Sequence, residues 1–153
     1  MALYERVADL PLVVDRVEFE RHERDTSSGF TRVTTEVVLH GASEVGRGED
    51  VIYDEGDQDA LPDLDADLAG EYTFDEFSTT LGECDLFPSG PARDDFREYR
   101  RWGFESAALD LALRQADRDL PAVLDRQPEP VRLVANRFEE EGIGDYTVST
   151  IRN

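Results

Sequence analysis

The chain has 153 residues, of which 36 are acidic and 16 are basic, and the resulting net charge of −20 argues against nucleic acid or an anionic membrane as a partner. All 16 basic residues are arginines, whereas 39% of the chain is hydrophobic. This acid-rich, lysine-free composition is typical of a cytoplasmic protein from an organism that balances external brine with internal salt, which screens repulsion between carboxylates. The regular apolar pattern favours this interpretation over a disordered acidic chain.

The length indicates one domain with a tail, and the sequence shows no export or membrane signal. No N-terminal stretch joins a basic region to an apolar one, and no apolar run approaches the ~18 residues of a membrane-spanning helix. We therefore expect a cytoplasmic location. Cys84 is the only cysteine, so no disulfide can form within the chain, and we interpret it as an apolar filler.

The first third of the chain is predicted to form strands. Apolar and polar residues alternate over 12–23, a turn cluster follows at 25–29, and β-branched residues are frequent over 30–41. A third strand is predicted over 44–55. Short turns between the three strands predict an antiparallel meander over about 12–53.

Beyond Tyr53 the apolar residues change to helical spacing, and helices are expected over about 57–126. Thr73 and Glu76 form a capping box, which marks a helix start. The predicted helices cover 57–68, 73–83, 94–117 and 119–126. Strands followed by helices define an α+β domain, predicted here for 1–127. After a QPEP break, a short strand over 131–138 begins a second unit, 128–153.

The longest predicted helix has an unusually wide apolar surface. Its polar positions Ser106, Asp110, Arg114 and Asp117 form one narrow stripe, and most of the remaining circumference is apolar or small. This pattern predicts packing partners on two sides of the helix.

Together these features resemble the N-terminal capping domain of the enolase superfamily, in its muconate-lactonizing and mandelate-racemase-like branches. The resemblance covers roughly residues 12–136. It rests on the meander followed by helices and on the segment GRGEDVIYDE, which is similar to a G-x-G-E turn of that family. The third feature is ESAALDLALRQADRDLPAVLDRQPEPVRLVA, which is similar to the family's Ala-rich helix, short P-L-x-x-L-L helix and first barrel strand.

The resemblance implies that the catalytic groups belong elsewhere. In this family a modified TIM barrel follows, and its strand ends supply lysine or histidine acid–base groups and three carboxylates for Mg²⁺. This chain has no lysine and ends soon after the predicted barrel strand, so we expect a truncated capping domain, catalytically silent alone, with 128–153 as a barrel remnant plus tail. Mg²⁺ is expected in the complete parent enzyme and no metal or other cofactor in this chain.

Capping-domain loops in this family close over the barrel mouth and contact the distal end of the substrate. The matching specificity positions are Asp25, Thr26, Ser27, Ser28, Gly29 and Phe30, together with Tyr53, Asp54 and Glu55. The expected partner is a barrel domain in cis or in trans, or a second copy bound through the uncovered apolar face. Two alternatives stay open: a free-standing acidic interaction module, and a half-enzyme that complements a separately encoded barrel.

Other chemistry finds little support in the sequence. The acidic stretch DEGDQDALPDLDADLAG fails as an EF-hand, because a loop starting at Asp63 would place Leu68 at the glycine position and Phe74 at the bidentate glutamate. His22 and His40 have no nucleophile motif around them, so we interpret them as surface or pairing histidines.

Overall fold

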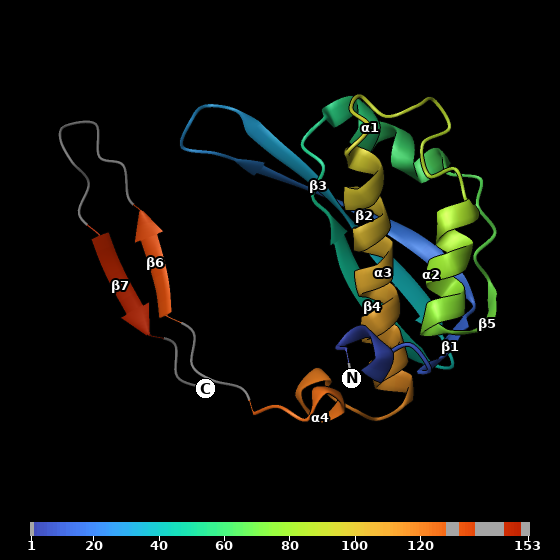
Figure 1. Cartoon of the computed structure of the whole chain (residues 1–153). Coiled ribbons are helices and arrows are strands. Elements are labelled where there is room, and N and C mark those ends of the chain that lie inside the picture. Colours follow the sequence, from blue (N-terminus) through green and yellow to red (C-terminus); the bar gives the residue numbers. More distant parts are fainter. Residues whose placement is uncertain (1, 128–131, 137–145, 151–153) are drawn as a thin grey trace.

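The computed structural model describes residues 2–127, 132–136 and 146–150. The elements in chain order are η1 (Tyr4–Arg6), β1 (Pro11–Val14), β2 (Arg16–Asp25), β3 (Thr31–Gly41), β4 (Glu44–Asp50), α1 (Glu55–Ala60), η2 (Leu61–Asp63), β5 (Gly70–Thr73), α2 (Phe74–Glu83), α3 (Phe96–Gln115), α4 (Leu120–Leu124), β6 (Arg132–Asn136) and β7 (Tyr146–Thr150) (Figure 1). In this part of the chain no helix is both long and apolar enough to cross a lipid bilayer.

Strands β2, β3 and β4 form the predicted antiparallel meander, which confirms the α+β class. Phe19 on β2 lies opposite Val37 on β3, and Val37 lies opposite Gly48 on β4. The sheet face that carries these residues is covered by α3, and the opposite face carries charged side chains. This division follows from the period-2 alternation of the strands.

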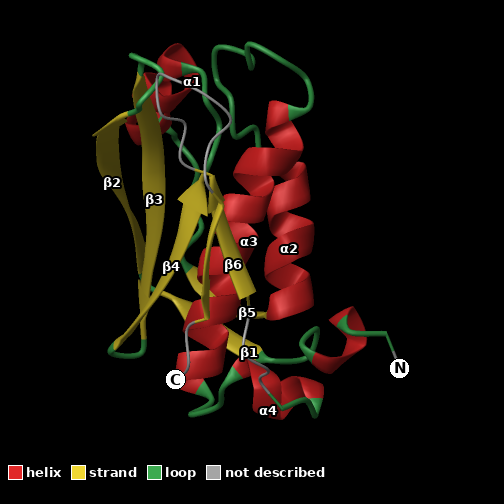
Figure 2. Ribbon diagram, turned by 90° about the vertical axis from the view of Figure 1, so that its left-hand side faces the viewer, coloured by secondary structure: helices red, strands yellow, loops and turns green. Residues whose placement is uncertain are grey.

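Helix α3 packs between the meander and α2, as Figures 1 and 2 show from two directions. Phe104, Ala107 and Leu111 are fully buried, whereas no member of the predicted polar stripe is. The prediction of packing on two sides is therefore confirmed.

Two glycines on β4 allow α3 to lie directly on the strand. A Cβ atom at Gly46 would lie 2.2 Å from the carbonyl oxygen of Ala107, and one at Gly48 would lie 2.2 Å from that of Gly103. Any side chain at these positions would push the helix away from the sheet. The two glycines thus serve helix packing within a strand and do not form a turn.

The predicted first strand is divided in two at Asp15. Its first part, β1, leaves the meander and pairs antiparallel with β5, with Leu12 opposite Tyr72. Strand β5 was not predicted. The helix predicted over 57–68 was too long: α1 and η2 end at Asp63, with Pro62 in the first turn of η2, and the chain then runs without a helix to β5.

The capping box at the start of α2 is confirmed, since the backbone N–H of Thr73 donates to Glu76 Oε2 at 2.7 Å and the N–H of Glu76 donates to Thr73 Oγ1 at 3.2 Å. The strand predicted over 131–138 is present as β6, and it pairs antiparallel with β7, a strand that was not predicted. Strands of a TIM barrel pair in parallel. Residues 128–131 and 137–145 of the predicted second unit lie outside the described residues, and its boundary stays a prediction.

Candidate functional site

The turn between β2 and β3 carries the first set of predicted specificity residues. The N–H of Thr26 donates to the carbonyl of Phe30 at 2.9 Å, and Gly29, with a φ of 83°, donates its N–H to the carbonyl of Thr26 at 3.1 Å. Thr31 Oγ1 donates to Asp25 at 2.8 Å. The turn is thus closed by its own hydrogen bonds, and it leaves Phe30 55% exposed.

The second set of predicted residues, Tyr53 to Glu55, connects β4 to α1. Asp54 caps α1 by accepting the N–H of Asp57 at 3.0 Å. Tyr53 is 59% exposed and packs edge-on against Phe96, with ring centroids 5.1 Å apart. The guanidinium of Arg93 lies over the Tyr53 ring, 5.9 Å from its centroid, and donates to its hydroxyl.

Both sets lie at the same end of the meander. Strand β4 ends at Asp50, opposite Thr35, and beyond that point the β2–β3 hairpin projects past the third strand (Figure 1). Arg32 on this projection donates to the carbonyl of Val51 at 3.3 Å, and Arg21 lies 3.7 Å from Glu55. Both predicted sets therefore lie at the same end of the meander. Arg21 and Arg32, which were not predicted to take part, connect the strands of the hairpin to the segment that follows β4.

A buried arginine anchors this loop end to α3. Arg100 is fully buried, and its Nε donates to the equally buried Asp50 Oδ2 at 2.8 Å. Its two terminal nitrogens donate to the carbonyls of Leu86 at 2.9 Å and Asp57 at 2.6 Å. The guanidinium also stacks over Phe87. One side chain thereby fixes the end of β4, the start of α1 and the loop before α3.

Arg100 was not predicted to be buried, although its position in the helix carried a signal. Positions 100, 104, 107 and 111 follow helical spacing, so Arg100 lies on the same buried face as Phe104, Ala107 and Leu111. A charged residue on an otherwise apolar face requires a buried partner, and Asp50 at the end of a strand is such a partner.

Gln58 also faces inward at this end. Its amide nitrogen donates to the carbonyls of Asp50 at 3.1 Å and Ile52 at 2.8 Å, whereas its Oε1 has no hydrogen-bond partner among the described residues. Gln58 borders a small cavity of about 150 Å³ that Arg21 and Thr35 also line. This cavity is large enough for ordered water.

A larger groove lies at the other half of β2. It has a volume of about 630 Å³ and is lined by residues 15–20 and 66–69, Pro62, Leu64 and Phe104. Because β2 starts at Arg16 and reaches the turn only after Asp25, this groove is distant along the strand from the loop end. Its lining mixes carboxylates with apolar side chains, and the sequence analysis did not predict it.

Two histidines and one cysteine are the remaining residues that the sequence drew attention to. His40 Nε2 lies 2.9 Å from Glu18 and His22 Nε2 lies 3.5 Å from Glu36, so the interpretation as pairing histidines is confirmed. Cys84 is partly buried against the core, and this burial raises the pKa of its thiol. A raised pKa reduces the thiolate fraction and agrees with a filler role.

These features define an α+β meander domain with a polar and aromatic loop end. Residues 5–123 match the family described as domain of unknown function (DUF8230), N-terminal domain, and the chain belongs to this family. No curated protein and no solved structure shows significant similarity to the chain.

Proposed function

We propose that this chain is a capping domain that closes over the mouth of an enolase-type catalytic barrel, supplied in cis or in trans, and that it shapes substrate specificity without catalysing a reaction itself. The observation that carries the proposal is that the β2–β3 turn and the Tyr53 to Glu55 segment lie at the same end of the meander, beyond the last residue of β4. The family's description as an N-terminal domain agrees with a role beside a further domain.

The chemistry of the loop end suits recognition of a substrate's distal part. Phe30 and Tyr53 expose aromatic rings, and Arg93 places a guanidinium next to the Tyr53 hydroxyl. Exposed aromatic and arginine side chains are the types most enriched where proteins bind ligands and partners. The Arg100 anchor holds the Tyr53 segment, whereas the turn depends only on its own hydrogen bonds and has more freedom to adapt.

The same residues do not fit a Mg²⁺ centre. Asp25 accepts the hydroxyl of Thr31, Asp54 caps α1, and Glu55 faces Arg21. Each carboxylate of the loop end thus has a partner, and they do not converge as three metal ligands do. The chain also has no lysine to act as a base, so both the metal and the acid–base groups are assigned to the barrel.

A second candidate function is a free-standing acidic interaction module that associates with another copy of itself. The observation that favours it is the exposed aromatic pair on α3, where Trp102 is 62% exposed and Tyr99 lies one turn before it. Exposed aromatic side chains of this kind are frequent at protein interfaces. The acidic, lysine-free composition further supports a cytoplasmic location at high internal salt.

Gene context and complex formation discriminate the two candidates. If the capping proposal holds, a barrel is encoded in the same reading frame or in one beside it. In the second case its product elutes with this chain as a stable complex. A homodimer of this chain that dissociates in Trp102→Ala, with no barrel frame nearby, would support the interaction module instead.

The role of the loop end is tested with the assembled complex. Tyr53→Ala is expected to raise the KM for substrate while kcat changes little, because the tyrosine contributes binding and no chemistry. Tyr4→Ala is the matched control, since Tyr4 is comparably exposed and belongs to η1, near the N-terminus, which lies at the opposite end of the molecule from α1 (Figure 1). Equal KM values in both variants would contradict the assignment of Tyr53.

A further inference from the structure

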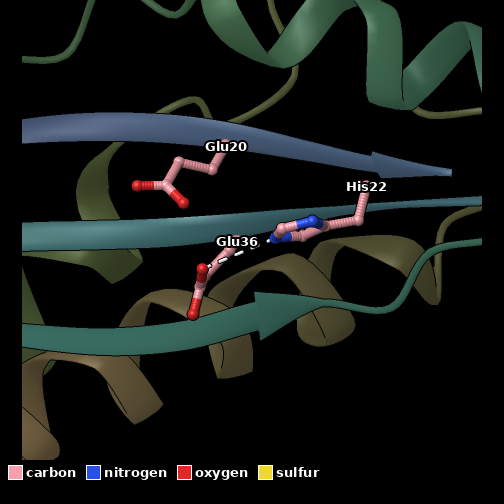
Figure 3. A group of neighbouring side chains, drawn as sticks. All are labelled: Glu20, His22 and Glu36. Carbon is pink, nitrogen blue, oxygen red and sulfur yellow. Dashed lines mark ion pairs between the residues drawn. The ribbon is translucent and has the colours of Figure 1, made fainter.

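Three potential metal ligands lie together on the charged outer face of the meander. Glu20 and His22 are on β2 and Glu36 is on β3, and one ligand atom from each lies within 4.8 Å of the other two (Figure 3). We propose that these three side chains form a binding site for a divalent transition-metal ion of the Zn²⁺ type. The site lies on the sheet face opposite α3, and the inference does not depend on the proposed capping role.

Strand register explains why these side chains meet. Glu20 lies directly opposite Glu36 in the antiparallel pair, and His22 follows Glu20 by two positions, so all three point to one face. Like charges directly opposite each other destabilise a sheet. The pair therefore favours a bound cation, and the imidazole lies where it can share that cation.

The ligand types select the ion. Zn²⁺ binds imidazole nitrogen and carboxylate oxygen at about 2.0–2.2 Å, which in tetrahedral geometry separates the ligand atoms by about 3.4 Å. Because the side chains of Glu20 and His22 are exposed, they can rotate and bring the three ligand atoms to this separation. One nitrogen with two oxygens favours Zn²⁺ and related ions over Mg²⁺ and Ca²⁺, which prefer oxygen ligands alone. Water would complete the coordination.

Arg47 on β4 is the present counterion of the cluster. Its Nη1 lies 3.4 Å from Glu20 and 2.8 Å from Glu36. Arg47 is about half exposed, and ion pairs of this kind contribute about 0–1 kcal/mol, so the guanidinium can turn out into solvent. A divalent ion would then neutralise both carboxylates. Arg47 therefore competes with the metal, and removing it should tighten binding.

The chain contains only two histidines, which makes the test specific. Zn²⁺ is titrated into the ¹⁵N-labelled chain in molar KCl with excess Mg²⁺, which occupies weak carboxylate sites. The ring nitrogen signals of His22 are expected to shift and those of His40 to stay, because His40 faces the single carboxylate Glu18. Shifts of equal size in both rings, or in neither, would overturn the proposal.

Variants measured by calorimetry provide the second readout. Even an outer-shell partner typically changes metal affinity by about 10- to 100-fold, so His22→Gln and Glu36→Gln are each expected to weaken Zn²⁺ binding at least about tenfold. His40→Gln is the matched control and should bind as the parent does, while Arg47→Gln should bind more tightly. All of the substituted side chains lie on the surface face of the sheet, and circular dichroism checks that each variant is folded. Unchanged affinity in His22→Gln would mean an adventitious ion only.

Discussion

Replacing Arg100 by methionine tests whether the buried ion pair holds the loop end to α3. Methionine keeps the apolar stem in its place against Phe87 but removes the guanidinium. The carboxylate of Asp50, which is fully buried, then retains only the N–H of Ile52, at 3.1 Å from its Oδ1. The carbonyls of Leu86 and Asp57 also lose their donor.

The expected cost is large because a charge is left buried without its partner. Removing one member of a buried ion pair typically destabilises a protein by about 3–5 kcal/mol. A domain of this size has a total stability of about 5–15 kcal/mol, so a substantial part of it would be lost. Adding Asp50→Asn to the variant should restore part of the loss, since it removes the uncompensated charge.

Arg101→Met is the matched control, because Arg101 is the next residue and forms a partly exposed ion pair with Glu105 at 2.9 Å. Such pairs contribute about 0–1 kcal/mol. The free energy of unfolding is measured by urea titration at one fixed KCl concentration for both variants. Equal losses in Arg100→Met and Arg101→Met would refute the reasoning, as would a double variant less stable than Arg100→Met alone.

Gly46→Ala should destabilise the domain by about 2 kcal/mol or more, because its Cβ would meet the backbone of α3. Gly56→Ala on α1 should cost much less, because its Cβ would meet only a side-chain oxygen of Asp54, at 3.3 Å. Equal melting temperatures in the two variants would contradict the packing described for β4. Leu111→Asp should cost several kcal/mol by burying an unpaired carboxylate. Asp110→Ala should cost about 1 kcal/mol, because Asp110 accepts a hydrogen bond from the backbone N–H of Arg47 on β4 at 3.0 Å. Similar urea midpoints for Leu111→Asp and Asp110→Ala would show that α3 is wrongly oriented. The melting temperature followed by circular dichroism should be higher in molar KCl than in dilute buffer, since a net charge of −20 is poorly screened at low salt; equal values would contradict the halophilic interpretation.

The local patterns of the chain predicted most of the fold. Alternation in the first segment, β-branched residues in the second and the short turns between the segments were sufficient for the meander. The capping box at Thr73 located the start of α2 to the residue. The wide apolar face around Leu111 correctly indicated two packing partners for α3. Each of these signals comes from residues that are close together in the sequence, so it can be recognised before the fold is known.

Contacts between distant segments escaped prediction for a physical reason. The pairing of β1 with β5 joins segments far apart in the chain, and no local pattern specifies which strands meet. Asp110 was predicted only as part of the polar stripe of its helix, yet it accepts a hydrogen bond from the backbone N–H of Arg47 on β4. Arg100 was missed because charged residues are exposed by default, and only a partner on another element makes burial possible.

The candidate site was predicted only through the family resemblance. The residues of the turn and of the Tyr53 segment follow ordinary turn and capping chemistry, and nothing in their local sequence shows that they lie at one end of the meander. The arrangement of Glu20, His22 and Glu36 depends on the register between β2 and β3. A shift of one residue would have placed the facing side chains on opposite faces of the sheet.

The central claim is that this chain shapes specificity for a barrel that performs the chemistry. Exchange of the α-proton of dipeptides and sugar acids in D₂O with Mg²⁺ tests it most directly. The chain alone should give only background exchange, because it has no lysine base and its loop-end carboxylates are all paired. If a barrel polypeptide is supplied, the complex should catalyse exchange that EDTA abolishes. With Tyr53→Ala in the complex, the same rate of exchange should require a higher substrate concentration. EDTA-sensitive exchange by the chain alone would contradict the account.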